Sequence, residues 1–187
     1  CCCWVTEELR TFLDAQKVQA PIETDTSWLC VGHVDEFSSF IPDPDSEKGF
    51  KFLYADTGEA WTLLETMDPD TALPRYLDTH WHGTVGEILT DDELRTRNDG
   101  VQANYLDPIL AQYKAEFGLT DDDIILIPSL FEQCGGPGYN VALIPGTPNL
   151  IVANDDGGTK LIVPDPFVRT DDSDQASDPF IADFVAR

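Results

Sequence analysis

Short apolar runs of strand length alternate along the chain with stretches of helical periodicity, and this alternation constrains the fold more than any other feature. At 187 residues with 42% apolar side chains, the chain is long enough to bury the core of one domain. The pattern predicts the α/β class. The apolar runs lie at residues 28–31, 50–55 and 124–127, and the helical stretches lie at residues 7–16, 57–67 and 91–117.

Two of the helical stretches carry clear end signals. Thr6 is a candidate N-cap for the helix at residues 7–16, whose Leu9, Phe12 and Leu13 share one face. Thr90 is a candidate N-cap for the longest helical pattern, at residues 91–117. We expect interruptions of that pattern near residues 98–100 and at Pro108, and an end at Gly118.

Further strands are predicted in the second half of the chain. The turn-forming residues 154–158 separate two short apolar runs, which is typical of a β-hairpin. A polar, acidic stretch at residues 170–178 is expected to be a loop, and residues 180–185 form another strand or helix. The predicted strands lie at residues 124–127, 140–144, 150–153 and 160–163.

The apolar run at residues 28–31 leads directly into an imidazole and a carboxylate two positions apart, His33 and Asp35. If the segment stays extended, Val31, His33 and Asp35 point to one side, because side chains on a strand repeat every two residues. A carboxylate can then hold a guanidinium while the imidazole transfers protons. An isolated His-x-Asp is more often a strand-end histidine bonded to a loop, so the flanking sequence decides between the two interpretations.

The flanking sequence resembles the catalytic domain of the peptidylarginine (protein-arginine) deiminases, which belong to the pentein superfamily. Pro145 and Asn149 also fall in the family's order and spacing. The blocks that carry the resemblance are DAQKVQAP at 14–21, WLCVGHVDEF at 28–37, FIP at 40–42, KGFK at 48–51, DDIILIPSLF at 122–131 and LIV at 150–152.

The resemblance implies a fold and a reaction. The fold is a pentein-type propeller of αβ modules, of which this chain holds several. The reaction is hydrolysis of peptidyl arginine to citrulline and ammonia through a thiouronium on a cysteine. His33 and Asp35 match two of the four catalytic groups, with Asp35 binding the guanidinium, and Val31 and Asn149 match positions that line the substrate site.

The other two catalytic groups, the nucleophilic cysteine and a second aspartate, match no residue of this chain, and neither do the family's main calcium ligands. We therefore expect the chain by itself to be inactive and to hold no metal, although the resemblance implies calcium as the cofactor. Residues 1–5 are interpreted as a cloning scar or a misassigned start, and residues 6–187 as part of the catalytic domain.

The five cysteines do not suggest a disulfide framework, which favours a reducing, cytoplasmic location. Cys30 is expected to be a small buried hydrophobe. Cys134 precedes two glycines and superficially resembles a nucleophile, but it falls where the family has a variable loop. Cys1, Cys2 and Cys3 are consecutive and match nothing in the family.

Two other groups of polar residues have simpler interpretations than metal binding. His80 and His82 have the spacing of a metal pair, but two ligands do not complete a zinc site. The run of aspartates at residues 121–123 lacks the alternating spacing of a calcium loop, so we expect a solvated acidic turn.

The formal net charge of −24 argues against nucleic acid as a partner and favours encounter with arginine-rich proteins, although a solvated acidic surface explains it equally simply. No apolar stretch reaches the length of a membrane span. Three functions stay open: a protein-arginine deiminase, a small-molecule guanidine deiminase or dihydrolase of the same superfamily, and a non-catalytic pentein module that binds arginine-rich partners.

Overall fold

The computed structural model describes residues 5–76, 82–144, 146–155 and 158–187 of the chain. Its strands within these ranges form one three-stranded sheet and two two-stranded sheets, none of which closes on itself. The predicted α/β class is therefore confirmed, whereas the propeller arrangement stays a prediction. No helix in the described ranges combines the length and the apolar character needed to cross a bilayer.

The central sheet has the order β1-β2-β3. Strands β1 (Ser38–Pro42) and β2 (Phe50–Asp56) are antiparallel and are joined by the predicted turn after Pro42. Strand β3 (Ile124–Pro128) is parallel to β2, with Phe52 opposite Ile124. A parallel pair needs a crossover connection, and helices supply it here. Strands β2 and β3 confirm the predicted strands at residues 50–55 and 124–127. The strand predicted at residues 28–31 is wrong, because that run is a turn in which Leu29 makes an isolated bridge to Asn140.

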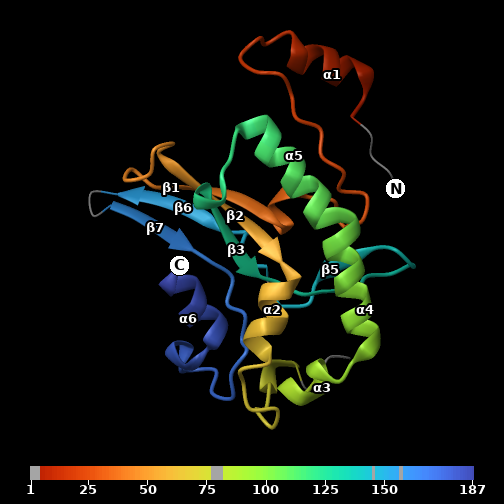
Figure 1. The fold of residues 1–187 in the computed structure, drawn as a ribbon, viewed down its shortest axis with the longest axis vertical. Helices are drawn as coiled ribbons and strands as arrows, with labels where there is room; N and C mark the ends of the chain where they lie inside the picture. The colour runs from red at the N-terminus through yellow and green to blue at the C-terminus, as the bar shows by residue number, and fades with distance from the viewer. Residues whose placement is uncertain (1–4, 77–81, 145, 156–157) are drawn as a thin grey trace.

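In the described part of this crossover the α-helices are α2 (Thr57–Leu64), α3 (Val85–Leu89), α4 (Asp92–Val101) and α5 (Asp107–Phe117). Figure 1 shows them on one side of the central sheet's end. Asp56 caps the first, because its Oδ1 accepts the amide N–H of Glu59. The third begins at Asp91, whose Oδ1 accepts the amide N–H of Leu94.

The predicted helix at residues 91–117 differs from the structure in detail. Its N-cap is Asp91, not Thr90, because the Thr90 hydroxyl donates to the Gly86 carbonyl at the end of α3. The backbone stays helical through residues 98–100 and past Pro108, and the interruption is a π-helical turn at Gln102–Leu106. Gly118, with φ of +62°, ends the helix as predicted.

The π-helical turn directs Gln102 toward the start of two helices. The Gln102 Oε1 accepts the amide N–H of Thr57 at 2.9 Å, and its Nε2 donates to Asp107 Oδ1 at 2.7 Å. Pro108 follows directly, near the start of α5, where its missing N–H is best tolerated. One side chain thus ties α2 to the junction of α4 and α5.

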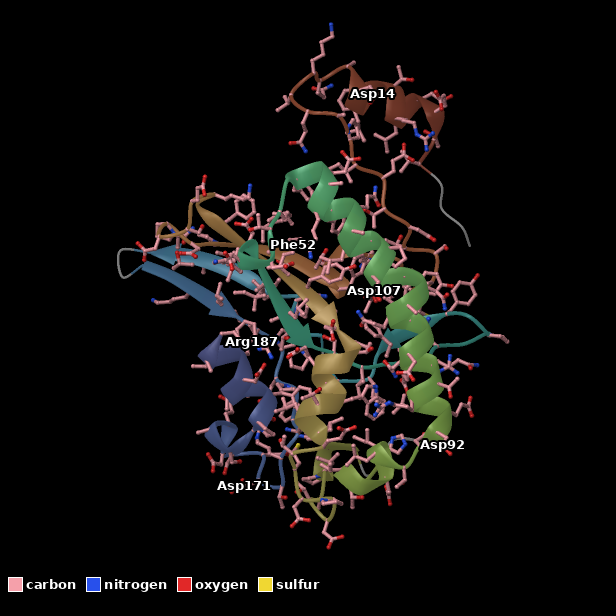
Figure 2. The ribbon with its side chains drawn as sticks, viewed as in Figure 1. Asp14, Phe52, Asp92, Asp107, Asp171 and Arg187 are labelled. Carbon is pink, nitrogen blue, oxygen red and sulfur yellow. A yellow bond between two sulfur atoms is a disulfide. The ribbon has the colours of Figure 1, made fainter. Side chains whose placement is uncertain are left out.

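Two apolar clusters form the core. The first lies between the central sheet and α5 and is rich in aromatic rings: Tyr54 is fully buried, and the rings of Phe52 and Tyr113 meet edge to face at 5.5 Å. The second joins α2, α3 and α4 to the C-terminal segment through Leu64, Leu94 and Phe180. Figure 2 shows Phe52 inside the body of the molecule, whereas Asp14 lies on a helix that stands apart from it.

That outlying helix is α1 (Glu7–Asp14), with Thr6 as its N-cap as predicted. It has no buried residue, and Phe12 is 60% exposed. An ion pair between Arg10 and Glu23, at 2.7 Å, links it to the segment that follows. The predicted helix is confirmed, but it ends two residues earlier than Gln16.

The remaining elements follow β3. Strands β4 (Phe131–Gln133) and β5 (Asn140–Ala142) form one antiparallel pair. Strands β6 (Ile151–Asp155) and β7 (Gly158–Ile162) form the predicted hairpin. Residues 180–185, left open between strand and helix, belong to helix α6 (Pro179–Ala186). The acidic stretch before it is largely loop, as predicted, with one short 3₁₀ turn at Gln175–Ser177.

Candidate active site

The segment that carries His33 and Asp35 is a tight turn, so the prediction of a strand is wrong here. Val34–Glu36 is a 3₁₀ helix with His33 at its N-cap. Gly32 precedes it with φ of +84°, a backbone conformation that ends the extended run. The alternation of a strand therefore does not determine where these side chains point. We refer to residues 33–36 as the motif turn.

Glu36 closes the motif turn from within. Its Oε1 accepts the amide N–H of His33 at 2.8 Å, and the amide N–H of Glu36 donates to the His33 carbonyl. This reciprocal arrangement satisfies the first backbone donor of a short helix. Sequence reasoning missed the role of Glu36, although an acid three residues after a candidate cap is the usual signal for it.

Buried residues hold both ends of the motif turn. Trp28 and Leu29 before it are 1% and 3% exposed, and Phe37 after it is fully buried. Asn140 of β5 donates its backbone and side-chain N–H groups to the Trp28 carbonyl and accepts the amide N–H of Cys30 at 2.8 Å. The turn is therefore anchored in the core on either side.

The residues between these anchors face solvent. His33 and Asp35 are exposed, and Val31 is 63% exposed. Two apolar residues next to His33 in sequence, Val31 and Val34, are 63% and 45% exposed. The segment thus exposes an imidazole, a carboxylate and two apolar side chains, and which of them a ligand would contact stays a prediction.

Asn149, predicted to line the substrate site, lies in a turn that packs against the motif turn. The amide N–H of Asn149 donates to the Gly146 carbonyl at 3.0 Å. A side chain on Gly146 would meet the Glu36 carbonyl at 3.2 Å, so the two backbones approach closely there. The structure therefore places the Asn149 turn beside the motif turn, with Asn149 exposed.

Cys30 is exposed and forms a disulfide with Cys134, so two predictions about cysteines are wrong. Cys30 is not a buried hydrophobe, and Cys134 is bonded to it across 104 residues of sequence. The absence of a disulfide framework was the argument for a reducing compartment, and this pair removes that argument. Sequence spacing did not reveal the pair because its halves come from distant segments.

The histidine pair at residues 80 and 82 is described in part, since His80 lies outside the described residues. His82 Nε2 lies 2.8 Å from Asp91 Oδ2, so its partner is the carboxylate that caps α4. The amide N–H of Leu94, and next the His82 ring, hold the pKa of Asp91 below its ordinary value. His82 thus supports a helix start.

The aspartates at residues 121–123 form an acidic turn, as predicted. Asp123 accepts the amide N–H of Thr120 at 2.8 Å, which holds the pKa of Asp123 below its ordinary value. Asp121 pairs with Lys114 at 2.6 Å. Among the described residues, no group of three or more His, Cys, Asp or Glu side chains is placed to hold a metal. The described residues therefore do not fit a calcium site.

An apolar cavity of about 530 Å³ lies away from the motif turn. It is enclosed by the central sheet, β7 and α6, with Leu53, Ile125 and Phe184 among its lining residues. None of the described residues that line it belongs to the segment 31–36. The segment 31–36 is thus a surface feature that does not line this cavity.

Comparison with known proteins decides the family. A sequence model described as protein-arginine deiminase matches residues 3–176. The chain belongs to the protein-arginine deiminase family.

Curated members of the protein-arginine deiminase family match most of this chain. It is 36% identical over 168 residues to protein-arginine deiminase type-4 of Mus musculus, covering 86% of this chain and 24% of that protein. It is 37% identical over 163 residues to the mouse type-1 protein, covering 85% and 23%. The type-3 protein of Homo sapiens is 36% identical over 170 residues, covering 87% and 24%. The chain spans about a quarter of the length of these relatives.

Proposed function

We propose that this chain contributes part of the active site of a protein-arginine deiminase, which hydrolyses the guanidinium of peptidyl arginine to a ureido group and releases ammonia. The observation that carries the proposal is the exposed, anchored motif turn at residues 33–36, within the stretch that matches the family. The relatives are protein-arginine deiminases, which supports a protein substrate over a small molecule. The net charge of −24 supports encounter with cationic substrates.

In this proposal Asp35 binds the guanidinium and His33 transfers protons. A guanidinium is planar and always charged, so a carboxylate that accepts two of its N–H bonds fixes the plane of the carbon that is attacked. A cysteine thiolate from outside residues 1–187 adds to that carbon, and His33 protonates the departing ammonia. His33 then takes a proton from the water that releases the cysteine and leaves the ureido oxygen.

Val31 and Asn149 are proposed to line the substrate site. Val31 is exposed next to the motif turn and would contact the apolar stem of the arginine. Asn149 lies in the turn that packs against Glu36 and would offer its amide to the substrate backbone. The proposed arrangement also needs the remaining modules of a pentein-type propeller, which would enclose the surface that is open here.

Calcium, which family resemblance implies, is proposed to bind outside the described residues. The candidate acidic groups are engaged elsewhere: Asp123 with Thr120, Asp121 with Lys114, and Asp91 with His82 and the start of α4. No step of the proposed reaction at His33 or Asp35 depends on the metal.

A binding experiment tests the guanidinium site on this chain alone. The chain is titrated with benzoyl-arginine ethyl ester while the imidazole resonances of His33 and His82 are followed by NMR. We expect the His33 resonance to shift, the His82 resonance to stay, and Asp35→Asn to abolish the shift. Benzoyl-lysine ethyl ester is the matched control, because it lacks the planar fork. An unchanged His33 resonance at saturating ester would contradict the proposed site.

A segment exchange tests catalysis. Residues 14–131 of this chain replace the matching segment of the mouse type-1 protein-arginine deiminase, and ureido product is measured with calcium and with a chelator. We expect His33→Ala and Asp35→Ala each to lower turnover by about 10²–10⁴-fold relative to the unmutated exchange. Near-normal turnover in either variant would refute its assigned role.

The same assay separates the other two candidate functions. A small-molecule deiminase would convert free arginine or agmatine faster than benzoyl-arginine ethyl ester. A binding module would shift the His33 resonance with arginine-containing peptides, yet the segment exchange would yield no product. We expect peptidyl arginine to be the preferred substrate.

A further inference from the structure

The disulfide between Cys30 and Cys134 joins the segment just before the motif turn to the antiparallel pair β4–β5, which we call the β4–β5 hairpin. The two Cα atoms are 5.9 Å apart, and the cysteines are separated by 104 residues of sequence. Cys30 lies three residues before His33. Cys134 directly follows β4, at the start of the loop that leads to β5. A covalent bond thus connects the approach to the motif turn with the end of a strand.

The disulfide acts at the boundary between buried and exposed backbone. Up to Cys30, the segment is held by burial of Trp28 and Leu29 and by the hydrogen bonds with Asn140. Beyond Cys30 the residues are exposed or half-buried until Phe37. The His33–Glu36 hydrogen bonds close the motif turn, and the Ser38 hydroxyl and the Phe37 amide N–H donate to the Val34 carbonyl from its downstream side. Among the described residues before the motif turn, Cys30 is therefore the last that is bonded to the β4–β5 hairpin.

The disulfide is also accessible to an external thiol. Cys30 is exposed and Cys134 is partly exposed. The loop after Cys134 contains Gly135 and Gly138, whose φ values of +65° and +89° are conformations that glycine adopts readily. Exposed disulfides of this kind are the ones that thiolates attack readily.

We propose that the Cys30–Cys134 disulfide is a thiol-controlled lock on the motif turn. In the oxidised state it fixes the turn that presents His33 and Asp35. An external dithiol opens it by two exchanges: a thiolate of the dithiol attacks one sulfur, and its second thiol then resolves the mixed disulfide. Cys30 and Cys134 gain two electrons and two protons, and the dithiol is oxidised to its cyclic disulfide. Cys30 and Cys134 are positioning residues in this scheme, which rests on the proposed function for its consequence in catalysis.

Hydrogen exchange of this chain tests the lock. All samples carry Cys1→Ser, Cys2→Ser and Cys3→Ser, so that no other thiol can exchange with the pair. Under oxidising conditions, mass spectrometry should find the peptides of Cys30 and Cys134 linked. Adding a dithiol should then speed amide exchange at residues 31–37 and 131–142 by about tenfold or more, while exchange in α5 stays unchanged.

A double variant removes the disulfide by mutation, so that its loss can be separated from other effects of the dithiol. Cys30→Ser with Cys134→Ser should exchange at residues 31–37 as the reduced protein does, with or without dithiol. The imidazole resonance of His33 should differ between the oxidised and reduced protein, whereas that of His82, which pairs with Asp91, should not. A change confined to His33 distinguishes a positioning role from general loosening.

Three outcomes would overturn the proposal: free thiols at Cys30 and Cys134 in the oxidised protein, equal acceleration of exchange in α5 and in the motif turn, or a His33 resonance indifferent to reduction. None of these measurements requires deimination. A failure of His33→Ala to lower turnover would therefore refute the proposed function while leaving the lock intact.

Discussion

Two regions of this molecule use aspartates differently: near the C-terminus they pair with an arginine of the chain itself, whereas Asp35 of the motif turn is only proposed to bind a substrate arginine. Near the C-terminus, Arg169 is enclosed with Asp165 and Asp178, and the side chains of Arg169 and Asp178 are 1% and 0% exposed. We call these three residues the Arg169 clamp. In the motif turn, Asp35 is exposed and its neighbour His33 is exposed beside it.

The two regions differ in whether water can reach their charged side chains. Asp165 holds Arg169 in a bidentate pair at 2.6 and 2.9 Å, and Asp178 adds a contact at 3.1 Å. Carbonyls of Asp171 and Asp172 accept its remaining donors, so the charge is fully paired and permanent. A site that turns over its ligand must instead leave room for a guanidinium to enter and for water to attack it. The exposed motif turn meets that requirement, and the Arg169 clamp does not.

The largest expected effect comes from breaking the clamp. We expect Arg169→Met to lower the free energy of unfolding by about 3–5 kcal/mol, because it leaves the buried Asp178 and the partly buried Asp165 without their cation. Urea unfolding measures this. Arg75→Met is the control: its pair with Asp172 is exposed and should contribute about 1 kcal/mol or less. Equal losses in the two variants would show that the clamp contributes no more than a surface pair.

The second-largest effect is expected from acid, which should lower the stability that the Arg169 clamp contributes. Hydrogen bonds from Arg169 hold the pKa of Asp165 below its ordinary value. Because the pKa is lower in the folded than in the unfolded chain, the stabilisation is complete above about pH 4 and is lost as the pH falls through the folded value. Burial raises the pKa of Asp56, which acts in the opposite direction. The urea midpoint should fall less between pH 7 and pH 3 in Asp165→Asn than in Asp174→Asn, which is an exposed control from the same loop. An equal fall of the midpoint in both variants would contradict the role given to Asp165.

A smaller effect is expected where the Asn149 turn meets the motif turn. Gly146→Ala should lower the free energy of unfolding by about 1 kcal/mol, since its methyl group would crowd the Glu36 carbonyl. Gly136→Ala is the control, because its methyl group would lie 3.9 Å from the Tyr139 ring. Thermal unfolding of both variants compares them directly. A neutral Gly146→Ala would indicate that the two turns separate easily.

The smallest effect on stability is expected at the proposed catalytic pair, His33 and Asp35. His33→Ala and Asp35→Ala should each change the free energy of unfolding by no more than about 0.5 kcal/mol, because both side chains are exposed. Urea unfolding measures both alanine variants beside Arg169→Met, so that the loss of stability at the motif turn is compared directly with the loss at the Arg169 clamp. A loss of several kcal/mol in either alanine variant would assign the motif turn a structural role.

Local signals in the sequence predicted the regular elements well. Thr6 and Gly118 cap helices as expected, and the runs at β2, β3 and the β6–β7 hairpin are strands, since each signal acts within a few residues. The π-helical turn escaped prediction because its cause is tertiary: Gln102 reaches across to Thr57.

The candidate site was predictable in identity but not in shape. His33 and Asp35 stand out by type and spacing, whereas the turn they occupy depends on Gly32 and on Glu36 reaching back to His33. The Cys30–Cys134 pair joins residues whose separation carries no pattern, 104 positions. In the Arg169 clamp the Asp165–Arg169 spacing is local, but the burial that makes the pair strong is set by the fold. Such contacts become visible only after the chain has folded.

The π-helical turn at Gln102–Leu106 has a consequence for sequence variation in this protein. A wide turn contains one more residue than the same length of regular helix needs. Removing a single residue there would bring α4 and α5 to a common helical winding, although Pro108 would still lack the N–H that bonds four residues back. We therefore expect a change in residue count to be absorbed at this turn more readily than within α4 or α5.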